Sequence, residues 1–338
     1  MKPTIIAEAG VNHNASLELA YALVDAAVVA GADIIKFQTC FPDEVVTAKA
    51  SKARYQLETT DSSETQLEMT RKIHLKFDEF LPLVKYCEER GIEFLTSAFG
   101  MKSLSFIETL NMKRFKIPSG EITNCPYVAR IAEHNKKTIV STGLCNIHEV
   151  ENAVNLMEKY GLDTKEKLTL LICNTAYPTP VADVNLARME TLRARFGCDV
   201  GFSDHTQGTT AATLAAVLGA SIIEKHFTLS KLLPGPDHRA SCEPHELTEL
   251  ITTINSIPDY LGDEQIVCTA SESENKFVAR KSIVASIAIK AGDIFCEDNL
   301  TTKRPLFGLG AENWFNLIGR KATRNYEIDE HILGEELF

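Results

Sequence analysis

Three pairs of polar residues, each spaced two positions apart, stand inside otherwise apolar runs of the sequence. The pairs are Lys36 with Gln38, Ser203 with His205, and Glu224 with His226. Residues i and i+2 of a β-strand point to the same face, so both members of a pair can reach one site. Burying ionisable side chains without partners costs free energy, so a functional site is a natural reason for their presence.

The two histidines of these pairs have the chemistry of metal ligands. His205 and His226 end consecutive apolar runs, so their imidazoles are expected on neighbouring strands, within reach of one ion. Two nitrogen ligands leave coordination positions for water and substrate, and they favour Mn, Fe, Co or Zn over Mg. The pattern predicts an open Lewis-acid site. The sequence leaves open whether Asp204 fixes a histidine tautomer or points outward.

Lysines and serines at the ends of several apolar runs predict an anion site. The set is Lys36, Ser97, Lys116, Ser119, Ser141 and Ser203. Such a cluster, helped by helix N-termini, suits a phosphate or a phosphate plus a carboxylate. A Schiff-base lysine is the competing interpretation, but two cations favour charge neutralisation over one desolvated amine. Glu8 and Glu121 remain as carboxylates for acid–base catalysis or for orienting a substrate.

Eight short apolar runs alternate with longer segments that are apolar at helical spacing. The runs are 4–9, 33–39, 92–99, 114–120, 137–143, 168–175, 199–206 and 221–229. Eight such repeats predict a (β/α)8 TIM barrel of about 250 residues, here 1–262, with its active site at the carboxyl ends of the strands. A helix cap or a solvated rim residue explains any one polar strand end, but here all eight ends are polar.

Two segments depart from this repeat. The connection from Cys40 to about Ile73 is longer than usual and predicts a functional lid, with a decorative insertion as the alternative. After Gly262 the sequence becomes polar, and 263–280 is predicted as a linker. Residues 281–338 carry short apolar pieces separated by turn signals, which predict a small module of short strands. A module of roughly 60 residues is marginally stable alone, so it is expected to dock on another surface.

The composition excludes several classes of partner. A net charge of −11 without any basic tract gives no electrostatic footprint for nucleic acid or for an anionic membrane. Nine scattered cysteines without a C-x-x-C spacing indicate neither a disulfide framework nor a thiolate metal cluster. No run has the pattern of a signal peptide or a membrane span. We therefore expect a soluble, cytoplasmic protein.

The order of these motifs resembles that of the sialic acid synthases. The matching segments are IAEAGVNHN, IIKFQT, FKIPSGEITN, STG, CNTAYPTP, GFSDHT, IEKHFTL, PGPDHRAS and TTKRP. The C-terminal module resembles the antifreeze-like (SAF) domain of that family. The resemblance implies an N-acetylneuraminate synthase, which condenses phosphoenolpyruvate with the open-chain aldehyde of N-acetylmannosamine and releases phosphate by C–O cleavage. The alternative is an N,N'-diacetyllegionaminate or related nonulosonate synthase that uses a 2,4-diacetamido-trideoxyhexose.

The resemblance also implies roles for the candidate residues. His205 and His226 match the ligands of a divalent metal, most often Mn²⁺, with Mg²⁺ or Co²⁺ as alternatives, and the lysines and serines match the positions that hold phosphoenolpyruvate. Lys225, on the other face of its strand, is interpreted as structural. The implied contacts of the amino sugar are Gln38, Tyr177, Asp237 and Arg304. The implied catalytic carboxylates are Glu8 for proton transfer, Glu121, which also matches a sugar contact, and Glu224, expected beside the metal or its water.

A domain-exchanged homodimer also follows from the resemblance, because in that family Arg304 of one subunit would reach the sugar bound by its partner. Two departures from the family pattern bear on specificity. Ser97 stands where the family usually has threonine, and Leu306-Phe307 stands where it often has a glycine-rich turn.

Two other classes of function remain as hypotheses. A pyruvate-dependent metalloaldolase would release no phosphate, and a sugar-binding or coat-assembly protein would bind without turnover.

Overall fold

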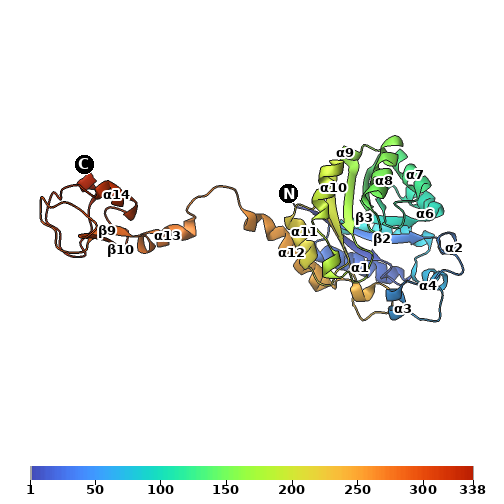
Figure 1. Ribbon diagram of the computed structural model, residues 1–338. Coiled ribbons are helices and arrows are strands. Elements are labelled where there is room, and N and C mark those ends of the chain that lie inside the picture. The colour runs from blue at the N-terminus through green and yellow to red at the C-terminus, as the bar shows by residue number, and fades with distance from the viewer. Residues whose placement is uncertain (1, 338) are drawn as a thin grey trace. The chain divides into compact units, whose positions relative to one another are not determined.

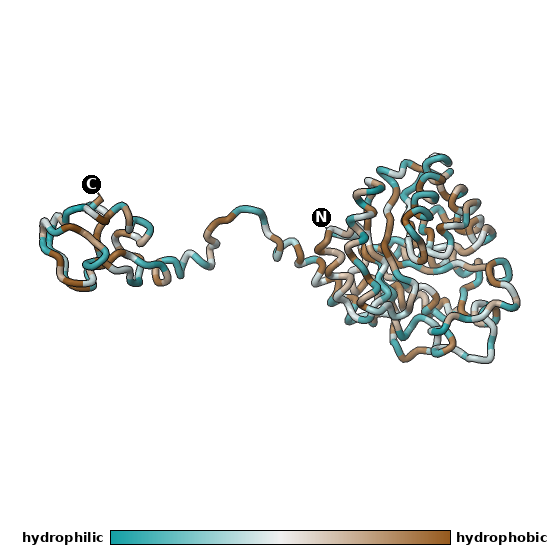
Figure 2. Tube along the Cα trace, viewed as in Figure 1, coloured by the Kyte–Doolittle hydropathy of each residue, from teal (hydrophilic) through white to brown (hydrophobic). Residues whose placement is uncertain are grey.

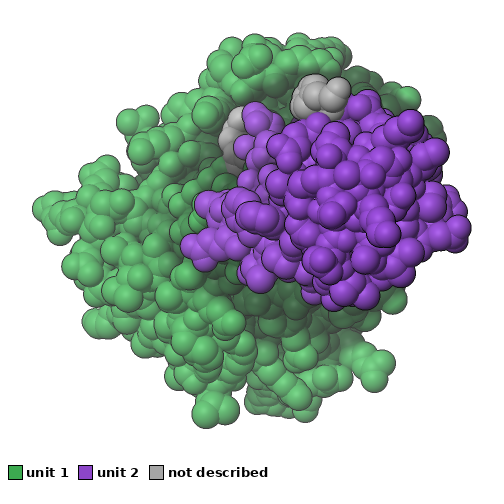
Figure 3. Space-filling model, turned by 90° about the vertical axis from the view of Figure 1, so that its left-hand side faces the viewer, with its two compact units in different colours: residues 1–262 green, residues 263–338 purple. Residues whose placement is uncertain are grey.

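The computed structural model of the chain describes residues 2–337 and divides into two compact units. Residues 1–262 form the barrel unit, and residues 263–338 form the C-terminal unit; Figure 3 colours them separately. Each unit has a hydrophobic core of its own.

The barrel unit is built on eight parallel strands (Figure 1). They are β1 (Thr4–Gly10), β2 (Ile34–Cys40), β3 (Glu93–Phe99), β4 (Arg114–Ile117), β5 (Lys137–Ser141), β6 (Leu168–Cys173), β7 (Asp199–Asp204) and β8 (Ile222–His226). The hydrogen-bonded order is β3-β2-β1-β8-β7-β6-β5-β4, and β3 also contacts β4, which completes the ring. This architecture confirms the (β/α)8 barrel predicted from the sequence. In Figure 2 the strands are mostly brown, as expected for strands that are buried on both faces.

Helices lie outside the strands and cover them (Figure 1). They are α1 (Leu17–Ala30), α5 (Phe77–Arg90), α6 (Gly100–Ile107) with η1 (Glu108–Leu110), α7 (Cys125–Glu133), α8 (Ile147–Lys159), α9 (Thr164–Lys167), η2 (Val181–Asp183), α10 (Arg188–Phe196), α11 (Thr210–Val217), η3 (His238–Ala240) and α12 (Pro244–Leu261). Local signals set their ends: Ser16 Oγ accepts the Leu19 N–H at the start of α1, and Gly31 closes that helix with φ of 85°. Among residues 2–337, no helix is long and apolar enough to cross a membrane.

The connection between β2 and α5 is an ordered insertion. It contains α2 (Pro42–Val45), α3 (Arg54–Thr59) and α4 (Gln66–Ile73). Lys52, which is 7% exposed, donates from Nζ to Thr60 Oγ1 at 2.9 Å and contacts Glu64 at 3.4 Å. Thr65 and Glu68 form a capping box at the start of α4. These internal contacts give the insertion a defined shape, so it can present side chains to the barrel.

The C-terminal unit contains short elements around a small core. They are α13 (Ala270–Ala279), β9 (Ser282–Ala285), β10 (Leu300–Lys303), η4 (Ala311–Asn313), α14 (Trp314–Leu317) and η5 (Gly334–Leu337). β9 and β10 pair in antiparallel fashion. Buried Glu336 fixes the end of the unit, because it accepts hydrogen bonds from Tyr326 Oη at 2.5 Å and Thr323 Oγ1 at 2.6 Å. The segment 263–280, predicted as a linker, includes the exposed helix α13.

Candidate active site

A polar cavity of about 160 Å³ lies at the carboxyl ends of the barrel strands. All three of the polar pairs that the sequence singled out line it, because alternation along each strand points both members inward. The predicted residues that the cavity brings together are Glu8, Lys36, Gln38, Ser97, Lys116, Ser119, Ser141, Tyr177, Ser203, His205, Glu224 and His226.

Glu224 is the centre of the charge network in this cavity. Its carboxylate accepts hydrogen bonds of 3.0 Å from Lys116 Nζ and from Ser203 Oγ, and it lies 3.8 Å from Lys36 Nζ. Lys36 also pairs with Glu8 at 2.7 Å. Since Lys116 stands on β4 and Glu224 on β8, this contact crosses the interior of the barrel. Glu224 therefore holds two lysines beside one another at the mouth.

The two carboxylates differ in their protonation. Burial raises the pKa of Glu8 above its usual value, as does the charge of Glu224, while Lys36 opposes the shift. Burial acts on Glu224 in the same direction, but Lys116 and Lys36 outweigh it and hold the pKa of Glu224 below its usual value. Two carboxyl groups whose pKa values are shifted in opposite directions suit different tasks in a reaction. Glu224 stays anionic, whereas Glu8 is able to exchange a proton near neutral pH.

Ser141 contacts Lys116, and a tight loop after β5 contacts Ser119. Lys116 Nζ donates to Ser141 Oγ at 2.7 Å, and the Gly143 N–H donates to Ser119 Oγ at 3.1 Å. A Cβ atom at Gly143 would lie 2.7 Å from Ser119 Oγ and 2.8 Å from Cys173 Sγ, so the close approach requires glycine. The cavity thus carries hydroxyl groups next to a buried ammonium, an arrangement that favours binding of an oxyanion.

His205 and His226 lie beside each other, with ring centroids 5.2 Å apart. His205 Nδ1 bonds to the carbonyl oxygen of Asn174, which places the proton on Nδ1 and leaves Nε2 with a lone pair. Nδ1 of His226 is buried and has no hydrogen-bond partner among the described residues. Burial lowers the pKa of His205 to about 4 and that of His226 well below its usual value, so both rings are neutral near pH 7. These donors fit a divalent transition metal.

A second group of potential metal ligands lies at the start of α12. Donor atoms of Glu243, His245 and Glu246 come within 4.8 Å of one another. Their oxygens already have partners: Glu243 Oε1 accepts the Lys231 N–H at 2.9 Å, and Glu246 Oε2 accepts the Glu243 N–H at 2.8 Å. Glu246 caps the start of α12 and Glu243 holds the Lys231 backbone, so both carboxylates already have structural partners, and the histidine pair is the stronger candidate for a metal site.

A larger cavity of about 260 Å³ adjoins the polar one and shares Gln38, Phe99, Tyr177 and His226 with it. Asp237, predicted as a sugar contact, lines this cavity, and burial raises its pKa to about 6. The Tyr177 ring stacks on His205 at 4.3 Å between centroids, which joins the metal candidate to the wider cavity. The two cavities together offer an anion site and an adjoining space for a second substrate.

Two predicted residues lie elsewhere. Glu121 is buried but lines neither cavity, because its carboxylate accepts the Gly100 N–H at 3.1 Å and the Asn124 Nδ2–H at 2.6 Å. It therefore serves the first turn of α6 in this structure. Arg304 belongs to the C-terminal unit, where its side chain is exposed just after β10.

Residues of the insertion were missed by the sequence analysis. Tyr55 on α3 lies 5.1 Å from Tyr177 between ring centroids, and Met69 and Thr70 on α4 line the larger cavity. The length of this connection marked the segment as a functional candidate. Its residue pattern gave no sign of which side chains would turn toward the barrel.

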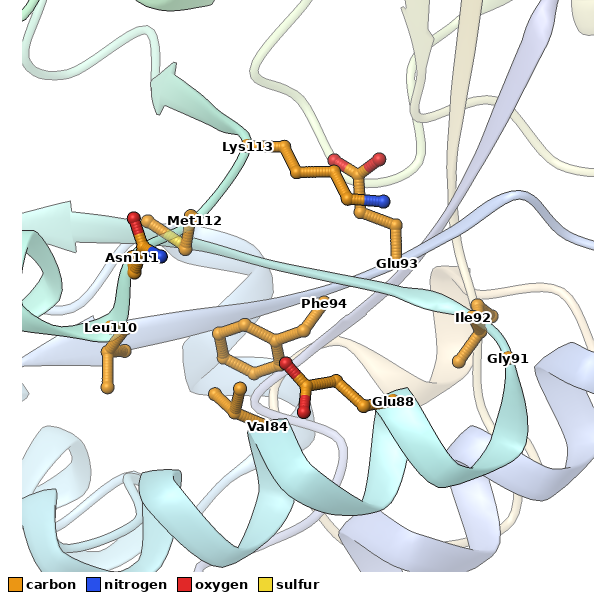
Figure 4. A pocket seen from close by; sticks show the side chains of 10 residues that line it. All are labelled: Val84, Glu88, Gly91, Ile92, Glu93, Phe94, Leu110, Asn111, Met112 and Lys113. Carbon is orange, nitrogen blue, oxygen red and sulfur yellow. The ribbon is translucent and has the colours of Figure 1, made fainter.

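Another cavity of the barrel unit, of about 410 Å³, lies far from this chemistry. Figure 4 shows Val84 and Glu88 on α5 facing Phe94 and the segment 110–113. Glu93, at its edge, pairs with Arg114 at 2.6 Å, and both residues begin their strands. In a TIM barrel that end supports stability rather than catalysis.

Known proteins resemble this chain along nearly its whole length. It is 46% identical to the N,N'-diacetyllegionaminic acid synthase of Campylobacter jejuni, over 98% of this chain and 99% of that one. It is 39% identical to the enzyme of the same name from Legionella pneumophila, over 98% and 94%. The crystal structure of an N-acetylneuraminic acid synthetase from Leptospira borgpetersenii, in complex with citrate, is 31% identical with a TM-score of 0.69, over 81% of this chain and 90% of that one.

Residues 23–266, which span most of the barrel unit, match the NeuB family. Together with relatives well above 30% identity over almost the full chain, this match shows that the protein is a member of the NeuB family of sialic acid synthases.

Proposed function

We propose that this protein is an N,N'-diacetyllegionaminic acid synthase that condenses phosphoenolpyruvate with a 2,4-diacetamido-trideoxyhexose. The observation that carries the proposal is the 46% identity to the Campylobacter enzyme of that name, over 98% of this chain and 99% of that one. Identity to the N-acetylneuraminic acid synthetase structure is 31%. The comparisons thus favour the alternative of the sequence analysis over its leading hypothesis, N-acetylneuraminate synthase.

The polar cavity suits the first substrate of this reaction. Lys36 and Lys116, with the hydroxyl groups of Ser119 and Ser141 nearby, would bind the phosphate and carboxylate of phosphoenolpyruvate. Glu224 holds both ammonium groups in place before the substrate arrives. Such preorganisation lowers the cost of fixing long side chains during binding.

The reaction forms a bond between C3 of phosphoenolpyruvate and the aldehyde carbon of the sugar, while water adds at C2 and phosphate leaves. The aldehyde oxygen gains one proton, and the attacking water loses both of its protons, the second of which goes with the departing phosphate, so the site needs a proton carrier. Glu8 suits this task, because its raised pKa allows both protonation states near neutral pH. A divalent metal held by His205 and His226 would polarise the aldehyde oxygen.

The larger cavity is the proposed place of the sugar. Gln38 and Tyr177 stand between the two cavities, so a sugar there would meet phosphoenolpyruvate at its reactive end. The Asp237 carboxylate can accept hydrogen bonds from sugar hydroxyl or amide groups. In this proposal Glu121 acts indirectly, by fixing the first residue of α6, directly after β3.

We propose further that residues 281–338 form an antifreeze-like (SAF) module, reached through a linker at 263–280, and that two chains exchange these modules in a dimer. The observations that support this are the separate core of the C-terminal unit and the exposed Arg304. Arg304 would then contact the acyl group of the sugar bound by the partner subunit.

Phosphate release provides the direct test. The purified protein is incubated with phosphoenolpyruvate, Mn²⁺ and either the 2,4-diacetamido-trideoxyhexose or N-acetylmannosamine, and the product is identified by mass spectrometry. We expect kcat/KM for the diacetamido sugar to exceed that for N-acetylmannosamine by at least 10-fold. A preference for N-acetylmannosamine would reverse the choice between the two synthases, and turnover of pyruvate without phosphate release would establish an aldolase instead.

A further inference from the structure

A fully buried ion pair lies directly behind the two histidines. Lys225 Nζ donates to Asp204 Oδ2 at 2.8 Å, and the exposed fractions of the two side chains are 1% and 0%. The same ammonium donates to the carbonyl oxygen of Thr206 at 2.6 Å. The other carboxylate oxygen, Oδ1, accepts the Thr206 N–H at 2.8 Å. These bonds to Thr206, together with the ion pair at Asp204, hold the backbone on both sides of His205.

The pair also ties two strands together at one level. Asp204 on β7 and Lys225 on β8 are paired Cα partners in the parallel ladder. Each is followed immediately by one of the histidines, and alternation along the strands sends the histidines into the barrel and the ion pair to its outer side. The contact on the outer side therefore fixes the register of β7 against β8, and with it the relative positions of the two imidazoles on the inner side.

Stability alone is a poor reason for such a pair. Desolvating two charges costs several kcal/mol, and buried ion pairs can often be replaced by apolar residues without loss of stability. A defined register is the best attested use of a buried polar contact. Here the ends of β7 and β8 need a fixed register, because a one-residue slip would turn one histidine away from the other.

We propose that Asp204 and Lys225 are positioning residues for the histidine pair: they hold His205 and His226 at the separation that a single divalent cation requires. Lys225 is then part of the site's support, in contrast to the purely structural role inferred from the sequence. The inference rests on the metal role proposed for the two histidines.

The test uses Lys225→Met and the double variant Asp204→Asn/Lys225→Met in the full-length protein. The double variant leaves no unpaired charge, so it should fold with a Tm near that of the wild type. Binding of Mn²⁺ alone, without either substrate, is measured by isothermal titration calorimetry. We expect Mn²⁺ affinity to fall roughly 10–100-fold in both variants, as for other residues that orient metal ligands.

A matched control is the double variant Glu93→Gln/Arg114→Met, which removes the ion pair at the opposite ends of the strands. It should bind Mn²⁺ as tightly as the wild type. Wild-type Mn²⁺ affinity in Asp204→Asn/Lys225→Met, or an equal loss in the control, would overturn the proposal. If Lys225→Met does not fold, the double variant decides.

A crystal structure of the metal-free double variant separates this inference from the proposed function. If the wild type binds no Mn²⁺, the metal role fails, and the position of the His205 ring then tests the pair by itself. A ring displaced from its bond to Asn174 supports positioning, whereas an unchanged ring refutes it.

Discussion

At the scale of single residues, two sites compete for the metal. Nδ1 of His226 has no hydrogen-bond partner among the described residues, whereas Glu243 Oε1 accepts the Lys231 N–H and Glu246 Oε2 accepts the Glu243 N–H at the start of α12. We predict that His226→Ala abolishes detectable Mn²⁺ binding and lowers kcat at least 100-fold, since metal polarisation supplies several kcal/mol.

His245→Ala is the matched control for this prediction. His245 is exposed, and its substitution should leave both Mn²⁺ affinity and kcat within about 2-fold of the wild type, as surface substitutions rarely have larger effects. Titration calorimetry and steady-state kinetics on both variants decide between the sites. Loss of Mn²⁺ binding in His245→Ala with retention in His226→Ala would assign the metal to α12.

Asp237 makes a prediction about pH. Burial raises the pKa of Asp237 from 3.8 to about 6, so the folded state binds its proton more tightly than the unfolded state does. The free energy of unfolding should therefore fall as the pH rises from about 4 to 6. Above pH 6, where the buried carboxyl group is ionised, the loss of unfolding free energy should reach its full value of roughly 2–3 kcal/mol.

Asp237→Asn removes this titration while keeping the shape of the side chain. The variant should gain stability over the wild type at pH 7.5 and show little difference at pH 4, measured by urea unfolding. It should also raise KM for the sugar. A stability difference that does not change with pH would show that the carboxylate is not desolvated in the folded protein.

At the scale of elements, the insertion between β2 and α5 shapes the wall of the larger cavity. Tyr55 on α3 packs against Tyr177, so it connects the insertion to the sugar side of the site. We predict that Tyr55→Ala raises KM for the sugar about 10-fold and changes KM for phosphoenolpyruvate less than 2-fold, because phosphoenolpyruvate is proposed to lie in the other cavity.

The control for this element is Leu57→Ala on the same helix. Leu57 is 44% exposed and does not line either cavity, so its substitution tests the helix without the tyrosine contact. Steady-state kinetics with each substrate varied in turn measures both variants. Equal changes in the two KM values for Tyr55→Ala would mean that the insertion acts on the whole site.

At the scale of the whole molecule, module exchange predicts complementation between two inactive variants. Arg304→Ala and His226→Ala each damage a different part of a composite site. In a mixed dimer with exchanged modules, one site carries both substitutions and the other carries neither. We therefore expect co-expressed mixed dimers, purified through two different tags, to recover about half of the wild-type activity, measured by phosphate release.

The two parent homodimers serve as controls and should each stay far below that level. If Arg304 served the barrel of its own chain, every site in the mixed dimer would carry one substitution. Activity no higher than the average of the two parents would therefore contradict module exchange.

The sequence by itself determined the barrel and the ends of its strands. Period-two alternation fixes which residues share a face, and a parallel barrel collects the carboxyl ends of all its strands at one mouth. Lys36 with Gln38 and Glu224 with His226 could therefore be placed in one cavity from local spacing alone. Ser119 and Tyr177 also line this cavity but lie beyond the ends of β4 and β6, where strand alternation no longer applies.

The tertiary structure decided which of these side chains meet. Alternation along a strand tells to which face a side chain points but not which side chain it contacts. The bond from Lys116 across the barrel to Glu224 therefore could not be predicted from the sequence. Glu121 follows its strand in an irregular turn, and there the N–H of Gly100 draws its carboxylate away from the cavity. Tyr55 and the Asp204–Lys225 pair depend on packing between segments distant in the chain. Local periodicity carries no information about such contacts, because only the folded chain brings their two sides together.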